Sequence, residues 1–255
     1  MSRVIVITGA SEGIGALLAK RQGAKGDALV LAARRKDKLE QVASQCGSRV
    51  LTVVTDVTKR LEVERLRDAA LERFEHIDVW INNAGRGIGI RVMDFTEEDL
   101  DEILAVNLKS AWYGMKAIIP HFQARGQGHL INISSVLGRV PLVPVRSAYS
   151  ASKAALNSLT ANLRMDLRAE YPNIHVSLIS PGPVSTEFHN NALGGTPSGR
   201  GMEMQSAEQV VHVIEGVIDD PAPDTYTNPS SAGLVQRYFE DIPAFEDEIA
   251  ARINK

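Results

Sequence analysis

Residues 4–15 read VIVITGASEGIG, and this stretch decides the expected fold. The apolar, β-branched run from Val4 to Thr8 predicts a short buried strand. Three glycines follow at once, Gly9, Gly13 and Gly15, and the apolar residues after them predict a helix. Glycine lets the backbone turn tightly and approach a diphosphate closely, while the helix N-terminus presents free N–H groups to the anion. The stretch therefore predicts a dinucleotide-binding turn, with an ordinary strand-to-helix turn as the alternative.

The pattern of strands and helices continues along the chain. Further strands are predicted at residues 28–33, 50–54, 77–81, 128–134 and 174–180, with a short last strand at 225–227. Helices are predicted at residues 60–74, 97–122, 149–170 and 206–219. Asn107 lies inside the helix predicted at 97–122. Because asparagine is a poor helix former, we expect a local distortion or a buried polar role at this position.

The composition narrows the class of protein. The chain has 255 residues, of which 44% are hydrophobic and 23% are charged, as in a globular protein with a sizeable core. Lys and Arg (28) nearly balance Asp and Glu (31), which argues against nucleic-acid binding. No apolar run reaches the length of a membrane span, and the apolar run that starts at Val4 is too short for a signal peptide. With Cys46 as its one cysteine, the chain is expected to be cytoplasmic and to bind neither membrane nor nucleic acid.

The end of the strand predicted at 28–33 bears on the choice of cofactor. An acidic residue at this position binds the ribose of NAD, whereas an arginine accommodates the 2′-phosphate of NADP. No Asp or Glu lies between Asp27 and Asp37, and Arg34 and Arg35 follow the strand directly. We therefore predict NADP(H) rather than NAD(H), with Arg34 as the phosphate ligand and Arg35 as its substitute. A solvated basic cluster is the alternative interpretation.

Polar and small residues follow the other predicted strands. Asp56 comes after the third strand, where a carboxylate can accept a hydrogen bond from the adenine amino group, although a turn aspartate needs no function. Residues 82–85, NNAG, close the fourth strand, and small residues there let a ligand lie against the backbone. Asparagine at this point can equally hold the neighbouring strand. Ser134 and Ser135 end the fifth strand and are expected to face the ligand crevice.

A possible acid–base pair opens the helix predicted at 149–170. Tyr149 and Lys153 stand four residues apart, so they share one face of a helix. A nearby positive charge favours the phenolate and lowers the pKa of a tyrosine. A tyrosine tuned in this way can donate or accept a proton near neutral pH. Taken alone, the pair also occurs by chance in many helices.

After the sixth predicted strand and the turn that follows it, the sequence predicts a long irregular loop. Residues 187–205 are rich in Gly, Asn and Pro and follow a strand's carboxyl end, so we predict a lid over the substrate site. The tail at 230–255 is predicted to pack on the domain, on another subunit or over the substrate. We expect residues 1–255 to form a single domain.

Several of these motifs occur in one order, and in that order the chain resembles the short-chain dehydrogenase/reductases, in their compact single-domain, NADP-preferring branch. The motifs are Thr8-Gly9-x-x-x-Gly13-x-Gly15, Asp56-Val57, Asn82-Asn83-Ala84-Gly85, Asn107, Ser135, Tyr149-x-x-x-Lys153 and Pro181-Gly182. The resemblance covers residues 3–186 well and the remainder by general layout. It implies an α/β fold, a Rossmann-like doubly wound parallel sheet of about seven strands with helices on both faces.

The resemblance also implies roles for individual residues. Tyr149 would be the general acid and base, and Ser135 would hydrogen-bond the substrate oxygen, with Ser134 left open as its substitute. Lys153 would hold the ribose and lower the pKa of Tyr149, and Asn107 would anchor a water in a proton relay. The residues expected to bind the cofactor are Gly9, Ser11, Gly13, Ile14, Gly15, Arg34, Arg35, Asp56, Val57, Asn83, Ala84, Gly85, Tyr149, Lys153, Pro181, Gly182, Val184 and Thr186.

The expected function is hydride transfer between a nicotinamide and a carbonyl or secondary alcohol of a small organic molecule. One alternative is reduction of a 3-oxoacyl thioester on an acyl carrier protein, and another is an NADP-binding sensor without catalysis. An epimerase would need a larger substrate domain. The six histidines show no paired spacing typical of a metal site, so no metal is expected. By resemblance, a homotetramer or homodimer is expected through the helices at 97–122 and 149–170.

Overall fold

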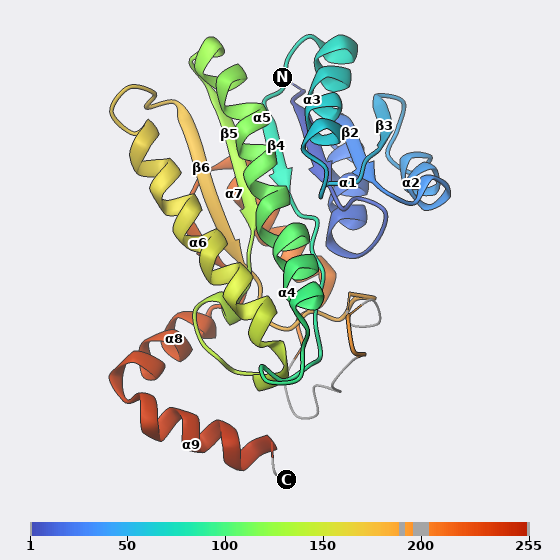
Figure 1. Cartoon of the computed structure of the whole chain (residues 1–255). Helices are drawn as coiled ribbons and strands as arrows, with labels where there is room; N and C mark the ends of the chain where they lie inside the picture. Colours follow the sequence, from blue (N-terminus) through green and yellow to red (C-terminus); the bar gives the residue numbers. More distant parts are fainter. Residues whose placement is uncertain (1, 189–191, 196–203, 254–255) are drawn as a thin grey trace.

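A sheet of seven parallel strands forms the centre of the computed structural model, which describes residues 2–188, 192–195 and 204–253 (Figure 1). The strands are β1 (Val4–Thr8), β2 (Ala28–Ala33), β3 (Val50–Val54), β4 (Val79–Asn82), β5 (Gly128–Ile133), β6 (Ile174–Ser180) and β7 (Asp224–Tyr226). They lie in the order β3-β2-β1-β4-β5-β6-β7, with each neighbouring pair parallel. The strand order reverses between β1 and β4, which confirms the predicted doubly wound, Rossmann-like fold.

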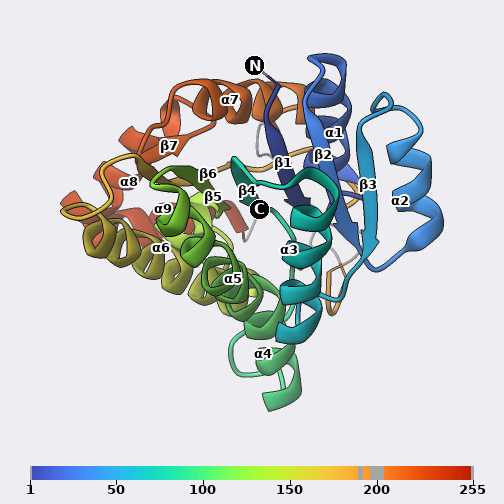
Figure 2. The ribbon, with the colours of Figure 1, turned by 90° about the horizontal axis from the view of Figure 1, so that it is seen from above.

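Helices cover both faces of this sheet (Figure 2). The helices are α1 (Gly13–Ala24), α2 (Lys36–Ala43), α3 (Arg60–Phe74), α4 (Glu97–Leu104), α5 (Ser110–Arg125), α6 (Ser147–Leu167), α7 (Ala207–Asp219), α8 (Ser230–Glu240) and α9 (Ile242–Ile253). One face is covered by α1, α2 and α7, and the other by α3, α5 and α6. Within the described ranges, none of these helices combines the length and the apolar character that a membrane crossing needs.

Burial on both faces explains why the central strands are apolar throughout. Every residue of β1 and β2 is buried, as expected for parallel strands between two helix layers. Leu18 and Ile214 pack in the core on one side, and Leu66 and Phe122 pack in the core on the other. The two cores fix the strands in register, so their carboxyl ends meet at one edge of the sheet.

The helix predicted at 97–122 contains a local distortion in the structure. A π-helical turn, Ala105–Lys109, separates α4 from α5, and Asn107 lies buried inside it. The chain stays helical through this turn, so the helical stretch and the expected distortion and buried polar role at Asn107 are confirmed. The predicted tail forms α8 and α9, and Phe245 and Ile249 of α9 pack in a small core with Val140 and Leu142. The tail thus packs on the loop that leads into α6.

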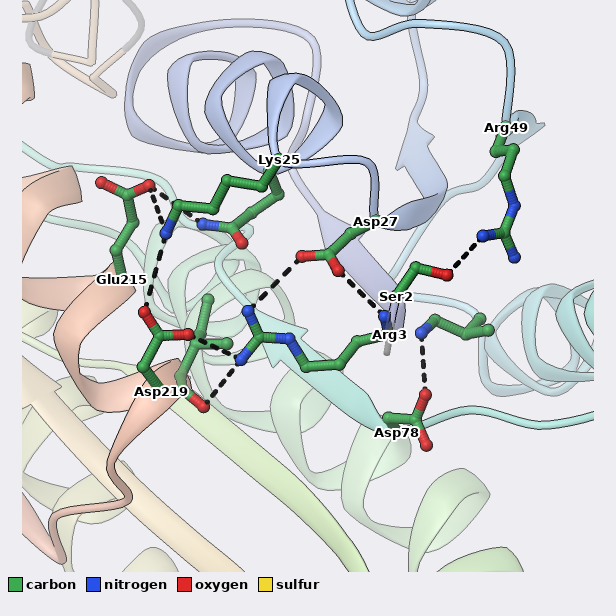
Figure 3. Close-up of polar contacts among 11 residues, drawn as sticks. Ser2, Arg3, Lys25, Asp27, Arg49, Asp78, Glu215 and Asp219 are labelled. Carbon is green, nitrogen blue, oxygen red and sulfur yellow. Dashed lines mark hydrogen bonds and ion pairs between the residues drawn. The ribbon is translucent and has the colours of Figure 1, made fainter.

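Ion pairs join the amino ends of the strands to the ends of the neighbouring helices (Figure 3). Arg3 contacts Asp27 at 3.6 Å and Asp219 at 2.7 Å, and its backbone N–H donates to Asp27. Asp78 accepts from the backbone N–H of Val4 at 2.8 Å. These contacts fix the start of β1 against α7 and the loop before β2.

Candidate active site

A cavity of about 770 Å³ opens at the carboxyl ends of the strands. Parallel sheets of this kind bind ligands at this edge, near the point where the strand order reverses. The predicted site residues that line the cavity are Gly9, Ser11, Gly13, Ile14, Arg34, Arg35, Asp56, Val57, Asn83, Ala84, Gly85, Ser135, Tyr149, Lys153, Pro181, Gly182, Val184 and Thr186. Gly15 and Asn107 are not among its lining residues. The structure thus gathers residues from the whole length of the chain around one space.

In the glycine-rich turn, the backbone packs closely against neighbouring segments of the chain. Gly9 has a φ of 67°, and a Cβ built on it would come within 2.8 Å of Ala84 Cα. A Cβ on Gly15 would come within 2.5 Å of the Gly9 carbonyl oxygen, so α1 packs on the turn only because that residue is glycine. Asn83 donates its side-chain amide to the Thr8 carbonyl at 2.9 Å and the Gly9 carbonyl at 3.2 Å. The asparagine therefore holds β1 and the glycine-rich turn to the segment after β4.

The first turn of α1 is suited to an anion. Within the described residues, Glu12 precedes this helix without a side-chain cap hydrogen bond, and its carboxylate lies 2.6 Å from Arg35. Gly13 and Ile14 line the cavity, where their turn carries the positive end of the helix dipole. The residues present therefore fit a bound diphosphate.

Two arginines, Arg34 and Arg35, line the cavity where β2 ends. Arg35 contacts both Glu12 and the Ser11 hydroxyl, the latter at 3.3 Å. Arg34 is exposed and lines the cavity near Asp56. Burial raises the pKa of Asp56, but hydrogen bonds from Thr58 and the charges of Lys59 and Arg34 outweigh it, so the pKa is lowered overall. Asp56 is therefore ionised at neutral pH and can accept hydrogen bonds.

The two serines at the end of β5 point to different partners. Both line the cavity, and the Ser134 hydroxyl donates to the Asn157 side chain of α6. The Ser135 hydroxyl donates to the Pro181 carbonyl at 3.5 Å and accepts from the Leu137 backbone N–H at 3.1 Å, and Ser135 acts to lower the pKa of Tyr149. Between the two serines, the geometry favours Ser135 as the one that can reach a substrate oxygen.

Tyr149 and Lys153 lie buried on the first turns of α6. Lys153 is 3% exposed, and its Nζ donates to the Ile133 carbonyl at 2.9 Å. The same nitrogen lies 5.7 Å from the centre of the Tyr149 ring. Burial lowers the pKa of Lys153 to about 8, because the interior disfavours its charged form. Above about pH 8 the lysine side chain is therefore mostly neutral.

The expected lowering of the Tyr149 pKa by Lys153 is not what the structure gives. Burial raises the pKa of Tyr149 above its ordinary value, and this effect exceeds two opposing ones, the hydrogen bond with Ser135 and the positive charge of Arg146. The sequence prediction was wrong because spacing reveals neighbours, whereas desolvation depends on the packing of Phe188, Ala148 and Ile88 around the ring.

Asn107 acts on the backbone beside the cavity. In the π-helical turn, its side-chain oxygen accepts from the Arg86 N–H at 2.8 Å, and its amide donates to the Arg86 carbonyl at 2.9 Å. The amide also donates to the Ser152 hydroxyl at 3.2 Å. A Cβ built on Gly85 would lie 3.3 Å from the Asn107 oxygen and 3.9 Å from Lys153 Nζ, so both groups border the same glycine.

The cavity wall includes residues that the sequence analysis did not select. Phe188 lines the cavity, and its ring meets the Tyr149 ring edge-on at 5.8 Å between centres. Arg146 and Val143 line it from the loop before α6. Positions 189–191 and 196–203 of the predicted lid lie outside the described residues. No pattern in the sequence marks Arg146, because it lies in a 3₁₀ turn before α6 and its direction follows from tertiary packing.

Comparison with known proteins agrees with this geometry. The family model described as short chain dehydrogenase matches residues 3–194. An uncharacterized oxidoreductase of Staphylococcus epidermidis is 31% identical over 215 residues, which cover 83% of this chain and 90% of that protein. The uncharacterized oxidoreductase YxnA of Bacillus subtilis is 32% identical over 258 residues, covering 98% of this chain and 72% of YxnA.

Solved structures with the same fold include cofactor complexes. A short-chain dehydrogenase/reductase from Burkholderia phymatum in complex with NAD superposes with a TM-score of 0.86, at 28% identity and 95% coverage of both chains. An alcohol dehydrogenase from Thermococcus sibiricus complexed with 5-hydroxy-NADP gives a TM-score of 0.77, at 29% identity, covering 89% of this chain and 95% of that one. The protein belongs to the short-chain dehydrogenase/reductase family and is an oxidoreductase of that family.

Proposed function

We propose that this protein is an NADP(H)-dependent oxidoreductase that acts on a carbonyl or a secondary alcohol of a small organic substrate. The observation that carries the proposal is the shared cavity. Ser135, Tyr149 and Lys153 line it together with the glycine-rich turn, although these segments lie far apart in the sequence. Binding of a dinucleotide alone would need no buried proton donor beside the ligand. The constellation therefore favours catalysis over a sensor role.

Each part of the dinucleotide has a matching segment of chain. The diphosphate would lie against the turn of Gly9, Gly13 and Gly15 and the first turn of α1. Asp56 would accept from the adenine amino group, with Val57 beside the ring. At the other end, residues 181–186 would hold the nicotinamide carboxamide, and Lys153 would donate to the ribose hydroxyls. When bound, the nicotinamide supplies or accepts the hydride.

The preference for NADP(H) rests on the basic end of the cavity. Arg34 follows β2 and lines the cavity, while Arg35 is engaged with Glu12. A guanidinium fork at this position is suited to the two negative charges of a 2′-phosphate. We therefore assign the phosphate to Arg34, with Ser11 and Arg35 as secondary contacts.

The chain's own residues would manage the proton and the charge on oxygen. In the reductive direction, the Tyr149 hydroxyl donates its proton to the carbonyl oxygen as that oxygen gains negative charge, and in oxidation the proton returns to Tyr149. Ser135 donates a hydrogen bond to the same oxygen and stabilises its charge. The positive charge of Arg146 and the hydrogen bond with Ser135 favour the tyrosinate that remains. Asn107 holds the backbone of Arg86 in place beside Gly85 and borders Lys153.

The test is oxidation of NADPH and NADH by the purified protein across ketones, aldehydes, oxo acids, quinones and 3-oxoacyl thioesters. We expect turnover with NADPH that falls about 1,000-fold in Tyr149→Phe, since the proton donor is lost. Arg34→Ala should weaken NADPH binding about tenfold and leave NADH binding unchanged, whereas the matched variant Lys36→Ala should affect neither. Tight NADPH binding without turnover on any class would favour the sensor alternative. Equal use of NADH and NADPH would refute the assignment of Arg34.

A further inference from the structure

A second buried cation lies beside Tyr149. Arg146 ends the 3₁₀ turn Pro144–Arg146 and directly precedes α6, three residues before Tyr149. It is 6% exposed, although arginine is rarely buried to this degree. A Cβ built on Gly87 would come within 2.4 Å of Arg146 Nη1 and 3.2 Å of the Phe188 ring. The guanidinium therefore lies over Gly87, at the same place as the aromatic ring that packs on Tyr149.

The charge of Arg146 affects the pKa of the Tyr149 phenol. The positive charge of Arg146 acts to lower the pKa of Tyr149, against the larger effect of burial. Burial lowers the pKa of Arg146, but an arginine starts from so high a value that this charge persists at neutral pH. A guanidinium in a desolvated wall attracts an anion more strongly than one in water, because the effective dielectric constant is lower.

The walls around this end of the cavity set the kind of anion. Leu137, Leu142, Val143 and Phe188 are apolar side chains that line it. Arg146, Lys153 and Arg86, all of them cations, are among the charged side chains that line the cavity. A single planar fork matches the two oxygens of a carboxylate. A phosphate would place a third oxygen against the apolar walls, where it would lose its hydration.

We propose that the substrate is an oxo acid or hydroxy acid whose carboxylate binds Arg146 while its carbonyl or hydroxyl oxygen meets Tyr149 and Ser135. The inference rests on the proposed function and defines its substrate class. Arg146 stands three residues before Tyr149 in the chain, and both side chains line the same cavity, so one small substrate can reach both. No covalent step is added to the hydride and proton transfers already described.

Calorimetric binding to the cofactor-free and the NADP⁺-loaded protein tests the proposal. The probes are 2-oxo, 4-oxo and 5-oxo acids of four to eight carbons, each paired with its methyl ester. We expect at least one acid to bind about 10- to 100-fold more tightly than its ester, and this difference to disappear in Arg146→Gln. Arg146→Lys should keep part of the difference. Arg168→Gln, which removes an exposed arginine at the other end of α6, should keep all of it.

The outcomes separate this inference from the proposed function. Equal binding of acids and esters by the wild type would overturn the carboxylate site, even if neutral carbonyls are reduced with NADPH. An equal loss for acids and esters in Arg146→Gln would also overturn it, since the arginine would then act on Tyr149 or on the fold. Preferential, Arg146-dependent binding of an acid without turnover of any carbonyl would count against the proposed NADP(H)-dependent reaction and support the site.

Discussion

At the amino ends of the strands, charged side chains meet partners of opposite sign, whereas at the carboxyl ends buried cations gather around a cavity. Arg3 contacts Asp27 and Asp219, and hydrogen bonds and charges from Arg3 and Lys25 lower the pKa of Asp219 (Figure 3). At the other edge, the pKa values of Lys153 and Arg146 are lowered chiefly by burial.

This difference separates stability from function along the strand direction. Ion pairs such as those of Arg3 hold neighbouring elements together, and charges that neutralise one another attract a ligand only weakly. A cation buried beside a cavity is costly for the folded chain, and that cost falls when an anion or a polar ligand binds. Substitutions at the amino edge should therefore change stability without changing turnover, whereas substitutions of the groups that face the substrate at the carboxyl edge should change turnover.

The pair of serines at the end of β5 should show a large contrast in turnover within one edge of the sheet. Ser135→Ala should lower turnover about 100-fold, because the hydrogen bond to the developing charge on the substrate oxygen is lost. Ser134→Ala should leave turnover within about threefold and lower the free energy of unfolding by about 1 kcal/mol, because Asn157 loses its buried donor. Steady-state kinetics and urea unfolding of both variants measure the contrast. A larger loss of turnover in Ser134→Ala would reverse the assignment.

Alkaline pH should stabilise the cofactor-free protein through Lys153. The folded lysine has a pKa of about 8, below its ordinary value of 10.5. Between these values the unfolded chain binds more protons than the folded one, so stability rises with pH. The free energy of unfolding of wild type relative to Lys153→Met should increase by about 3 kcal/mol from pH 8 to pH 10.5, since one pKa unit corresponds to about 1.4 kcal/mol. A difference that stays flat across this range would show that Lys153 titrates normally in the folded protein.

The sequence predicts the frame of the site well because its signals are local. Strands β1, β2 and β3 have the bounds that their apolar runs predict. A parallel sheet then places the carboxyl ends of these strands at one edge. Residues at those ends, such as Asp56 and Asn83, are therefore brought together without knowledge of side-chain packing. The capping box at Ser206 and Gln209 likewise marks the start of α7 from sequence alone.

The remaining features depend on tertiary packing, which no local pattern encodes. The sequence shows that Tyr149 and Lys153 are neighbours, but it does not show how far burial shifts their pKa values. Arg146 and Phe188 reach the cavity from segments outside the regular elements, and their direction follows from contacts with Gly87 and Tyr149. The π-helical turn at Asn107 is indicated by one unfavourable residue, whereas its geometry depends on the clamp to Arg86.

The smallest expected effect on turnover is at the amino edge, where Glu215 joins α7 to α1. Its carboxylate, 6% exposed, lies 2.6 Å from Arg21 and 3.0 Å from Lys25, and it accepts from the Gln22 amide at 3.2 Å. Glu215→Gln should lower the free energy of unfolding by about 2 kcal/mol, less than for a fully buried pair because both cations are about two-fifths exposed to solvent. Turnover should stay within twofold of wild type, since the residue lies far from the cavity.

Asp220→Asn is the matched control for Glu215→Gln, because it removes an exposed carboxylate at the end of the same helix. Its unfolding midpoint in urea should remain close to that of the wild type. If Glu215→Gln reduced turnover as strongly as Ser135→Ala, the two edges of the sheet would be coupled. The cation cluster at the carboxyl ends would then depend on the ion pairs at the amino ends, and the separation of stability from function would not hold.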